Sequence, residues 1–244
     1  MMLFLLKSLP LIEAWNASYI TRLFQIVDEL IYYAHEAEKR STCSESPLAF
    51  ALDEMDKVNK FFTVRSMRNH WTHLRDMPQA RGLDEYRKGG NCTFLALAIQ
   101  ARLTKYVKTK LDTEPGTLRS KSGTPLLDYA LRPRRVTPMT MRYHSVRDEC
   151  GIDIEMVQLL LDRGANPNQQ VHLNEGRTVW ALFLVSCYES TLRNEATKLL
   201  KEVWFRVCKL MIRYHASSTA WFDNNTSKPL TVEGILGVLW YGVD

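Results

Sequence analysis

The sequence predicts an all-α protein, in which a helical region (residues 1–85) precedes a region that repeats itself (residues 86–244). In the first region, apolar residues recur at the i, i+3, i+4 spacing of an amphipathic helix. In the second, a short pattern of threonine followed by apolar residues occurs three times. The chain has 244 residues, of which 45% are hydrophobic and 24% charged. That composition is typical of a folded protein with a substantial core.

Two helices are expected in the first region. The first covers residues 11 to about 34, where the apolar side chains form a broad face. The second begins at Ser46 and Pro47, because serine caps free amides and proline fits the first helical turn. Its apolar face contains Leu48, Leu52, Met55, Val58 and Phe62, and its carboxylates Asp53, Glu54 and Asp56 are interpreted as a solvated surface. The polar segment 81–91 ends in two glycines and is interpreted as a linker.

The second region contains two recurring patterns. The threonine pattern occurs at residues 93–98, 124–130 and 178–182. A partner pattern follows the later two, so that residues 156–168 align with residues 207–217. The first two threonines are 31 residues apart and the next two are 54 apart. Insertions are therefore expected near residues 132–148 and 190–201.

These patterns resemble the ankyrin repeat, on the residues Thr124-Pro125-Leu126 and, later, Leu159-Leu160-Leu161-Asp162-Arg163-Gly164-Ala165-Asn166-Pro167-Asn168. The resemblance implies about three degenerate repeats, each a pair of helices that stacks on its neighbour as an α-solenoid. In the motif, threonine caps the first helix, Gly164 closes the second in a left-handed conformation, and Asn166 and Asn168 suit the turn beyond. His215 stands where the motif has glycine, so strain is expected there.

The amino-terminal region is similar to a segment of large fungal NACHT-type nucleotide-binding proteins. The similarity is based on Leu52-Asp53-Glu54-Met55 and His70-Trp71, followed by degenerate ankyrin repeats. It implies that the chain is the sensing or partner-binding arm of such a protein, or a detached relative of one. The sequence contains no Gly-x-x-x-x-Gly-Lys-Ser/Thr motif, so this chain alone is not expected to bind nucleotide in that way.

The sequence offers little for catalysis, metals or cofactors. His70 and His73 could share a metal on one helix face, and with the acidic helix face they are the only candidates for an unrecognised enzyme site. A surface or packing role is the preferred interpretation, and no cofactor is expected. Cys187 and Cys208 lie in apolar runs and are predicted to be core residues. Scattered cysteines and the absence of a long apolar run favour a reducing, cytoplasmic setting without a transmembrane segment, although the nucleus remains open.

Positive charge is concentrated in residues 102–147, which contain eleven Lys or Arg against three acids, a local net charge of +8. Arg102, Lys105 and Lys108 are expected to form one basic helical face, and Arg132, Arg134 and Arg135 open the expected insertion. A solvated face is one interpretation. The other is an electrostatic adaptor for an anionic partner, which would be an acidic protein, a membrane surface or nucleic acid.

The preferred function is non-catalytic protein–protein recognition. A binding surface is expected at the turn after Asn168, where His172, Asn174 and Arg177 are predicted to project toward a protein partner. The stripe of Trp204, Phe205, Val207, Cys208, Met211 and Ile212 is interpreted as repeat core rather than a partner groove. The apolar tail 230–240 is expected to be a last helix that caps the stack or, alternatively, a docking surface.

Overall fold

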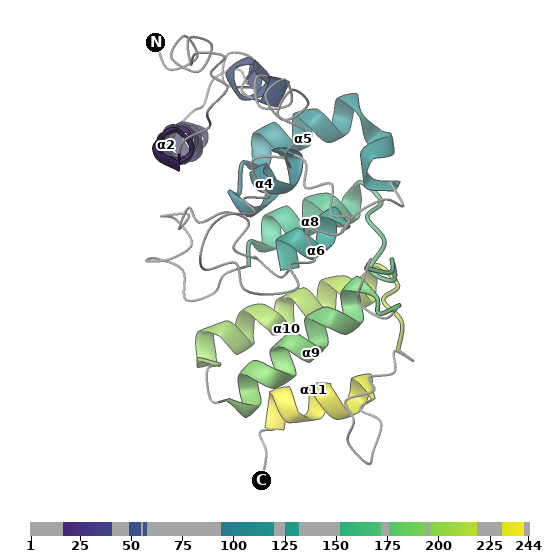
Figure 1. The fold of residues 1–244 in the computed structure, drawn as a ribbon. Coiled ribbons are helices and arrows are strands. Elements are labelled where there is room, and N and C mark those ends of the chain that lie inside the picture. The colour runs from purple at the N-terminus through teal and green to yellow at the C-terminus, as the bar shows by residue number, and fades with distance from the viewer. Residues whose placement is uncertain are drawn as a thin grey trace. The chain divides into compact units, whose positions relative to one another are not determined.

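A computed structural model describes residues 17–40, 49–54, 56–57, 94–119, 125–131, 152–171, 176–193, 196–218 and 231–241, with side chains of the first helix from Glu29 onward. The described residues belong to two units, the first ending at Glu114 and the second beginning at Pro115 (Figure 1). The predicted linker 81–91 lies outside the described residues, so the domain boundary near residue 85 stays a prediction.

The first unit contains three named helices and one further helical segment. The named helices are α2 (Ala17–Arg40), α4 (Phe94–Gln100) and α5 (Thr104–Thr113), and residues 49–54 and 56–57 are also helical. Ile31, Leu52, Leu97 and Val107 are buried in its core. Helix therefore forms in the described parts of both predicted segments, residues 17–40 and 49–57 without 55, whereas Ser46, Pro47 and most of the predicted apolar face of the second helix lie outside the described residues.

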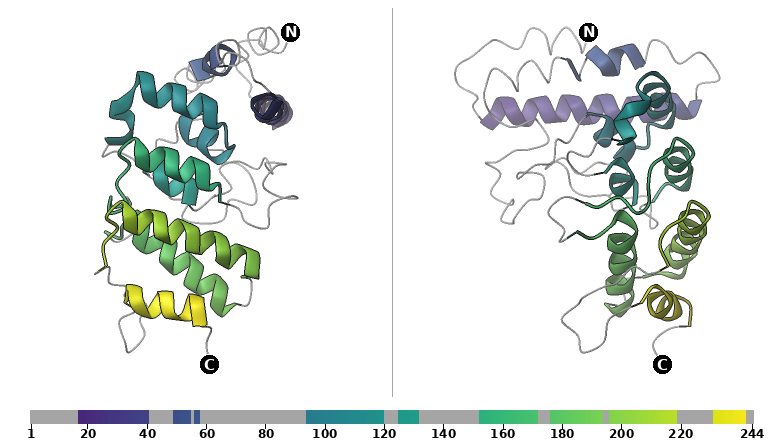
Figure 2. Two further views of the ribbon diagram at one scale, coloured as in Figure 1. Left: turned by 180° about the vertical axis from the view of Figure 1, so that it is seen from behind. Right: turned by 90° about the vertical axis from the view of Figure 1, so that its right-hand side faces the viewer.

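The second unit contains the 3-10 helix η1 (Pro115–Arg119) and the helices α6 (Leu126–Leu131), α8 (Ile154–Asp162), α9 (Val179–Leu192), α10 (Lys198–Arg213) and α11 (Val232–Tyr241). Helix α6 packs on α8 and α9, α10 packs on α8, and α11 packs on α9. Helices α9 and α10 lie side by side in every view (Figures 1 and 2). The second unit thus has two layers, one of α6, α9 and α11 and the other of α8 and α10.

Short polar side chains cap the amino termini of three of these helices. Asp153 accepts hydrogen bonds from the amides of Glu155 and Met156 at the start of α8. Thr178 accepts from the amide of Ala181 in α9, and Thr197 accepts from that of Leu200 in α10. Each cap satisfies an amide that the first turn leaves without a helical partner. The predicted threonine cap is confirmed at Thr178.

Helix length differs between the pairs of the second unit. Helix α8 has 9 residues, whereas its counterpart α10 has 16. Part of the extra length expected near 190–201 therefore lies in α10, which begins at Lys198. The other expected insertion, near 132–148, lies outside the described residues.

The fold class is confirmed at the level of secondary structure. Within the described ranges the chain forms helices and turns, and β pairing is limited to one isolated antiparallel bridge between Gln170 and Thr178. Cys187 and Cys208 are buried, as predicted. The stripe on α10 is core only in part, because Ile212 is 53% exposed and Phe205 is half-buried. The tail forms helix α11, in which Val232, Ile235 and Leu239 are buried.

Candidate interaction surface

The loop that follows α8 is closed by a left-handed residue. Gly164 has φ 92°, and the turn donates hydrogen bonds from the amide of Gly164 to the carbonyl of Leu161 and from Ala165 to Leu160, each 3.0 Å long. This pair of bonds ends the helix and turns the chain away from its axis. The conformation predicted for Gly164 is confirmed.

The same closure occurs twice more in the described residues. After α10, His215 has φ 64°, and the amides of His215 and Ala216 donate to the carbonyls of Ile212 and Met211. After α4, Arg102 has φ 58°, and the amides of Arg102 and Leu103 donate to Ile99 and Ala98. The left-handed conformation expected at His215 is confirmed, and it is strained for a residue with a Cβ atom.

Asn168 connects the two loops of the second unit. Its Nδ2 donates to the carbonyl of His215 at 2.7 Å, and its Oδ1 accepts from the amide of Ser217 at 2.8 Å. The side chain of Asn166 accepts from the amide of Asn168 at 2.9 Å, which forms the turn predicted for these asparagines. One amide side chain therefore holds the loop after α8 against the loop after α10.

Residues 170–171 and 176–178 form the base of a hairpin, called the 170–178 hairpin below. The amide of Val171 donates to the carbonyl of Arg177 at 2.9 Å beside the bridge between Gln170 and Thr178. Gly176 has φ 75°, a conformation that glycine adopts at little cost. Trp180, fully buried at the start of α9, donates from Nε1 to the carbonyl of Ser217 at 3.0 Å. The hairpin base is thus fixed to both α9 and the loop after α10.

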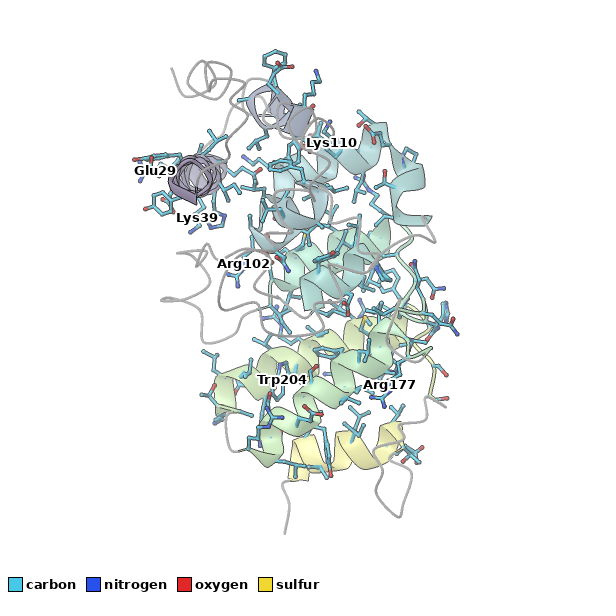
Figure 3. All side chains as sticks on the ribbon, in the orientation of Figure 1. Glu29, Lys39, Arg102, Lys110, Arg177 and Trp204 are labelled. Carbon is cyan, nitrogen blue, oxygen red and sulfur yellow. The ribbon has the colours of Figure 1, made fainter. Side chains whose placement is uncertain are left out.

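Of the predicted site residues, the structure describes only Arg177. It is half-buried on the second arm of the 170–178 hairpin (Figure 3), where its carbonyl accepts the bond from Val171. His172, Asn174, Arg132, Arg134 and Arg135 lie outside the described residues. What the structure establishes is the ordered base on which His172 and Asn174 are carried.

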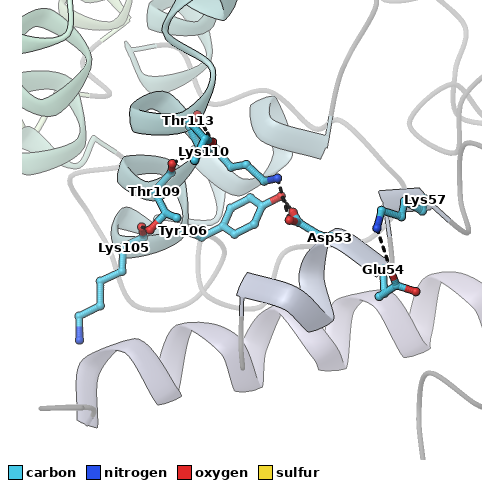
Figure 4. Close-up of polar contacts among 8 residues, drawn as sticks. All are labelled: Asp53, Glu54, Lys57, Lys105, Tyr106, Thr109, Lys110 and Thr113. Atoms are coloured by element: carbon cyan, nitrogen blue, oxygen red, sulfur yellow. Dashed lines mark hydrogen bonds and ion pairs between the residues drawn. The ribbon is translucent and has the colours of Figure 1, made fainter. Parts of the chain in front are cut away.

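The expected basic face of residues 102–108 requires a correction. Helix α5 begins at Thr104, so Arg102 precedes it in the left-handed turn and shares no helix with Lys105 and Lys108. Lys110, another cation of this segment, forms an ion pair within the first unit, because its Nζ lies 2.7 Å from Oδ2 of Asp53 (Figure 4). An adaptor based on residues 102–147 stays a prediction.

The acidic helix face that the sequence predicted to be solvated is partly buried, as the environment of Asp53 shows. Its side chain is 30% exposed, accepts a 2.8 Å hydrogen bond from the hydroxyl of Tyr106 and pairs with Lys110 (Figure 4). Burial, followed by the bond to Asp53, raises the pKa of Tyr106 above its usual value. Tyr106 therefore stays protonated and donates to Asp53. Glu54 is also partly buried, with 19% of its side chain exposed, and it pairs with the exposed Lys57 at 2.9 Å.

The described residues form no recognisable metal site. No three His, Cys, Asp or Glu side chains come together in this part of the chain as metal ligands would. His70 and His73 lie outside it. No helix in the described ranges is both long and apolar enough to cross a bilayer.

Sequence reasoning missed the charge on α10. Residues 198–213 were interpreted from their apolar stripe alone, although the same segment contains five Lys or Arg side chains. The signal was available in the helical period, because residues opposite a buried stripe form the exposed face.

Comparison of the chain with protein-family models, curated proteins and solved structures gives no significant match. The sequence and the geometry described above are therefore the basis of the functional proposal.

Proposed function

We propose that the repetitive region is a degenerate ankyrin-type stack and that the chain is a non-catalytic protein–protein recognition module. The packing of the second unit supports the stack, since α9 packs on α6 and α10 packs on α8. Like helices of successive pairs are therefore neighbours, as in a solenoid. The shared closure at Gly164 and His215 adds a second likeness between the two pairs.

The observation that supports the binding surface best is the double hydrogen bond of Asn168. It connects the turn before the 170–178 hairpin to the loop after the next helix, so the base of the hairpin is held in one geometry. A rigid base lowers the entropy lost when a loop binds a partner. His172, Asn174 and Arg177 supply polar groups on this hairpin for the recognition of another protein. In a longer NACHT-type protein the same surface would serve a sensing arm.

The test replaces His172, Asn174 and Arg177 together with alanine. A matched control replaces Glu155, Gln158 and Arg193, three exposed polar residues of the second unit that lie outside the hairpin. Immobilised wild-type and variant chains are incubated with an extract of the source cells, treated with a short cross-linker and analysed by quantitative mass spectrometry. The hairpin variant should lose the proteins that wild type and control retain, with an unchanged unfolding midpoint.

The position of the cross-links decides the result. Partner cross-links that map to residues 168–179 support recognition by the hairpin. Equal retention of the same proteins by all three chains, with cross-links elsewhere, contradicts it.

A further inference from the structure

The exposed side of α10 bears a concentration of positive charge. Between residues 198 and 213 the helix has five basic side chains and one acidic, a net charge of +4. Its charged residues are Lys198, Lys201, Glu202, Arg206, Lys209 and Arg213. All are exposed except Lys201, which is partly exposed. The whole chain has a net charge of +5, so this one helix contributes a large share of it.

These five cations have no carboxylate within ion-pair distance among the described residues, although other surface cations do. Arg193 pairs with Glu189 at 3.4 Å, and Lys39 and Arg40 both pair with Glu36. The neighbouring helix α8 exposes Glu155 and Asp162, and Asp162 accepts a hydrogen bond from the hydroxyl of Tyr214. The charge of the α10 surface is therefore available to an anionic partner.

Apolar groups stand among these cations. The helix buries Val203, Trp204, Val207, Cys208 and Met211, whereas Phe205 is half-buried and Leu199 and Ile212 are 48% and 53% exposed. Phe205 and Ile212 are seven residues apart and so lie in one row of the helix. Nζ of Lys209 lies 4.1 Å from the ring centroid of Phe205, a close cation–π contact. The exposed face combines an apolar row with basic flanks.

This combination favours an acidic protein segment over a membrane or a nucleic acid. The continuous apolar side of α10 is buried in the second unit, so the helix cannot insert that side into lipid as an interfacial helix does. Lys209 already covers one face of the Phe205 ring, the only aromatic side chain on the exposed part of α10, whereas single-stranded nucleic acid is bound by several stacking aromatic side chains. Apolar anchors at helical spacing between charges are what an amphipathic helix recognises.

We propose that the exposed face of α10, formed by Lys198, Phe205, Arg206, Lys209, Ile212 and Arg213, is a docking site for an acidic amphipathic segment of a partner protein. The carboxylates of this segment pair with the basic side chains of α10, and the apolar residues of the segment contact Phe205 and Ile212. The docking site shares no residue with the 170–178 hairpin, so the two proposals can fail independently.

The test measures binding of a fluorescent helical peptide of glutamate and leucine to the full chain by anisotropy. The first variant replaces Lys198, Arg206, Lys209 and Arg213 with glutamine. Its matched control replaces Lys39, Arg40, Lys57 and Arg193, four cations that already form ion pairs on other helices. Because single exposed pairs each contribute modestly, we expect the four α10 substitutions to weaken binding about tenfold and the control to change it little.

A second variant separates the apolar contribution from charge. Ile212→Ser leaves every cation in place and changes an exposed residue, so the fold should tolerate it. This substitution should weaken binding of the glutamate–leucine peptide and leave binding of poly-glutamate unchanged. Binding should also fall as salt is raised to about 0.5 M, where exposed charges are strongly screened.

Three further results bear on the proposal. A lysine–leucine peptide should not bind, and alanine substitution of His172, Asn174 and Arg177 should leave peptide binding intact. Equal loss in the α10 variant and its control would overturn the proposal. So would binding of vesicles of phosphatidylserine and phosphatidylcholine, or of a DNA duplex, that depends on the four α10 cations while the acidic peptide does not bind.

Discussion

At the scale of single residues, the closures after α8 and α10 place two different amino acids in one backbone conformation. Gly164 and His215 have φ 92° and 64°, and no atom lies within 4 Å of a Cβ built on Gly164. Gly164→Ala should therefore destabilise the protein by about 1 kcal/mol through backbone strain alone. His215→Gly should stabilise it by about 0.5 kcal/mol, because glycine relieves the strain but gains entropy in the unfolded chain. Urea unfolding measures both, and a loss of stability in His215→Gly would contradict this account.

The two buried thiols lead to a prediction about pH. Burial raises the pKa of Cys187 and raises that of Cys208 from 9.0 to about 12. In the native protein both should resist iodoacetamide at pH 8, where the unfolded chain is alkylated readily, as peptide mapping would show. Above about pH 9 the unfolded thiols lose protons before the folded ones, so stability should fall as pH rises. Replacing both cysteines with alanine should make that decline shallower; an unchanged decline would assign it to other groups.

At the scale of elements, the start of α5 depends on a side chain from α2. Leu103 precedes α5 and provides no side-chain cap, and the two carboxylate oxygens of Glu38 accept from the amides of Lys105 and Tyr106 at 3.0 Å each. Glu38→Ala should cost about 1 kcal/mol, the usual value of a lost cap. Hydrogen exchange at Lys105 and Tyr106 should accelerate, whereas the cap of α8 at Asp153 should be unaffected. Unchanged exchange at both amides would show that this contact is absent in solution.

Elements were predicted well where the evidence lies within one segment. The helical spacing before residue 40, the cap at Thr178 and the closure at Gly164 depend on neighbouring residues, so the sequence contains them. The cap by Glu38 joins residues 67 and 68 positions apart, and the contact of Asp53 with Tyr106 spans 53. No local pattern encodes such pairs. The same limit explains why Asp53 was interpreted as solvated. Arg102 was placed on the helix of Lys105 and Lys108 for a local reason, because it occupies a left-handed turn that glycine usually marks.

At the scale of the whole molecule, the second unit is held by contacts between neighbouring helices. Ile235 is fully buried where α11 packs on α9. Ile235→Ala should cost about 2–4 kcal/mol, as deletions in a packed core do. In a stack with nearest-neighbour interactions the loss of amide protection should be greatest in α9 and α10 and smaller in α6 and α8. Hydrogen exchange measures this protection. A uniform loss of amide protection along the unit would show that the unit unfolds as one cooperative body.

Helix α9 also constrains how this protein can be synthesised. Nine of its 14 residues are buried, including consecutive positions from Val179 to Val185, so most sides of the helix need cover. Part of that cover is α11, which begins at Val232, about forty residues after α9 ends at Leu192. At typical elongation rates, the ribosome needs several seconds to synthesise the residues from α9 to α11, and during that time part of the apolar surface of α9 is uncovered. A chain released before α11 is made would expose that surface to chaperones and proteases. Chains that lack α11 should therefore be degraded more readily than complete ones.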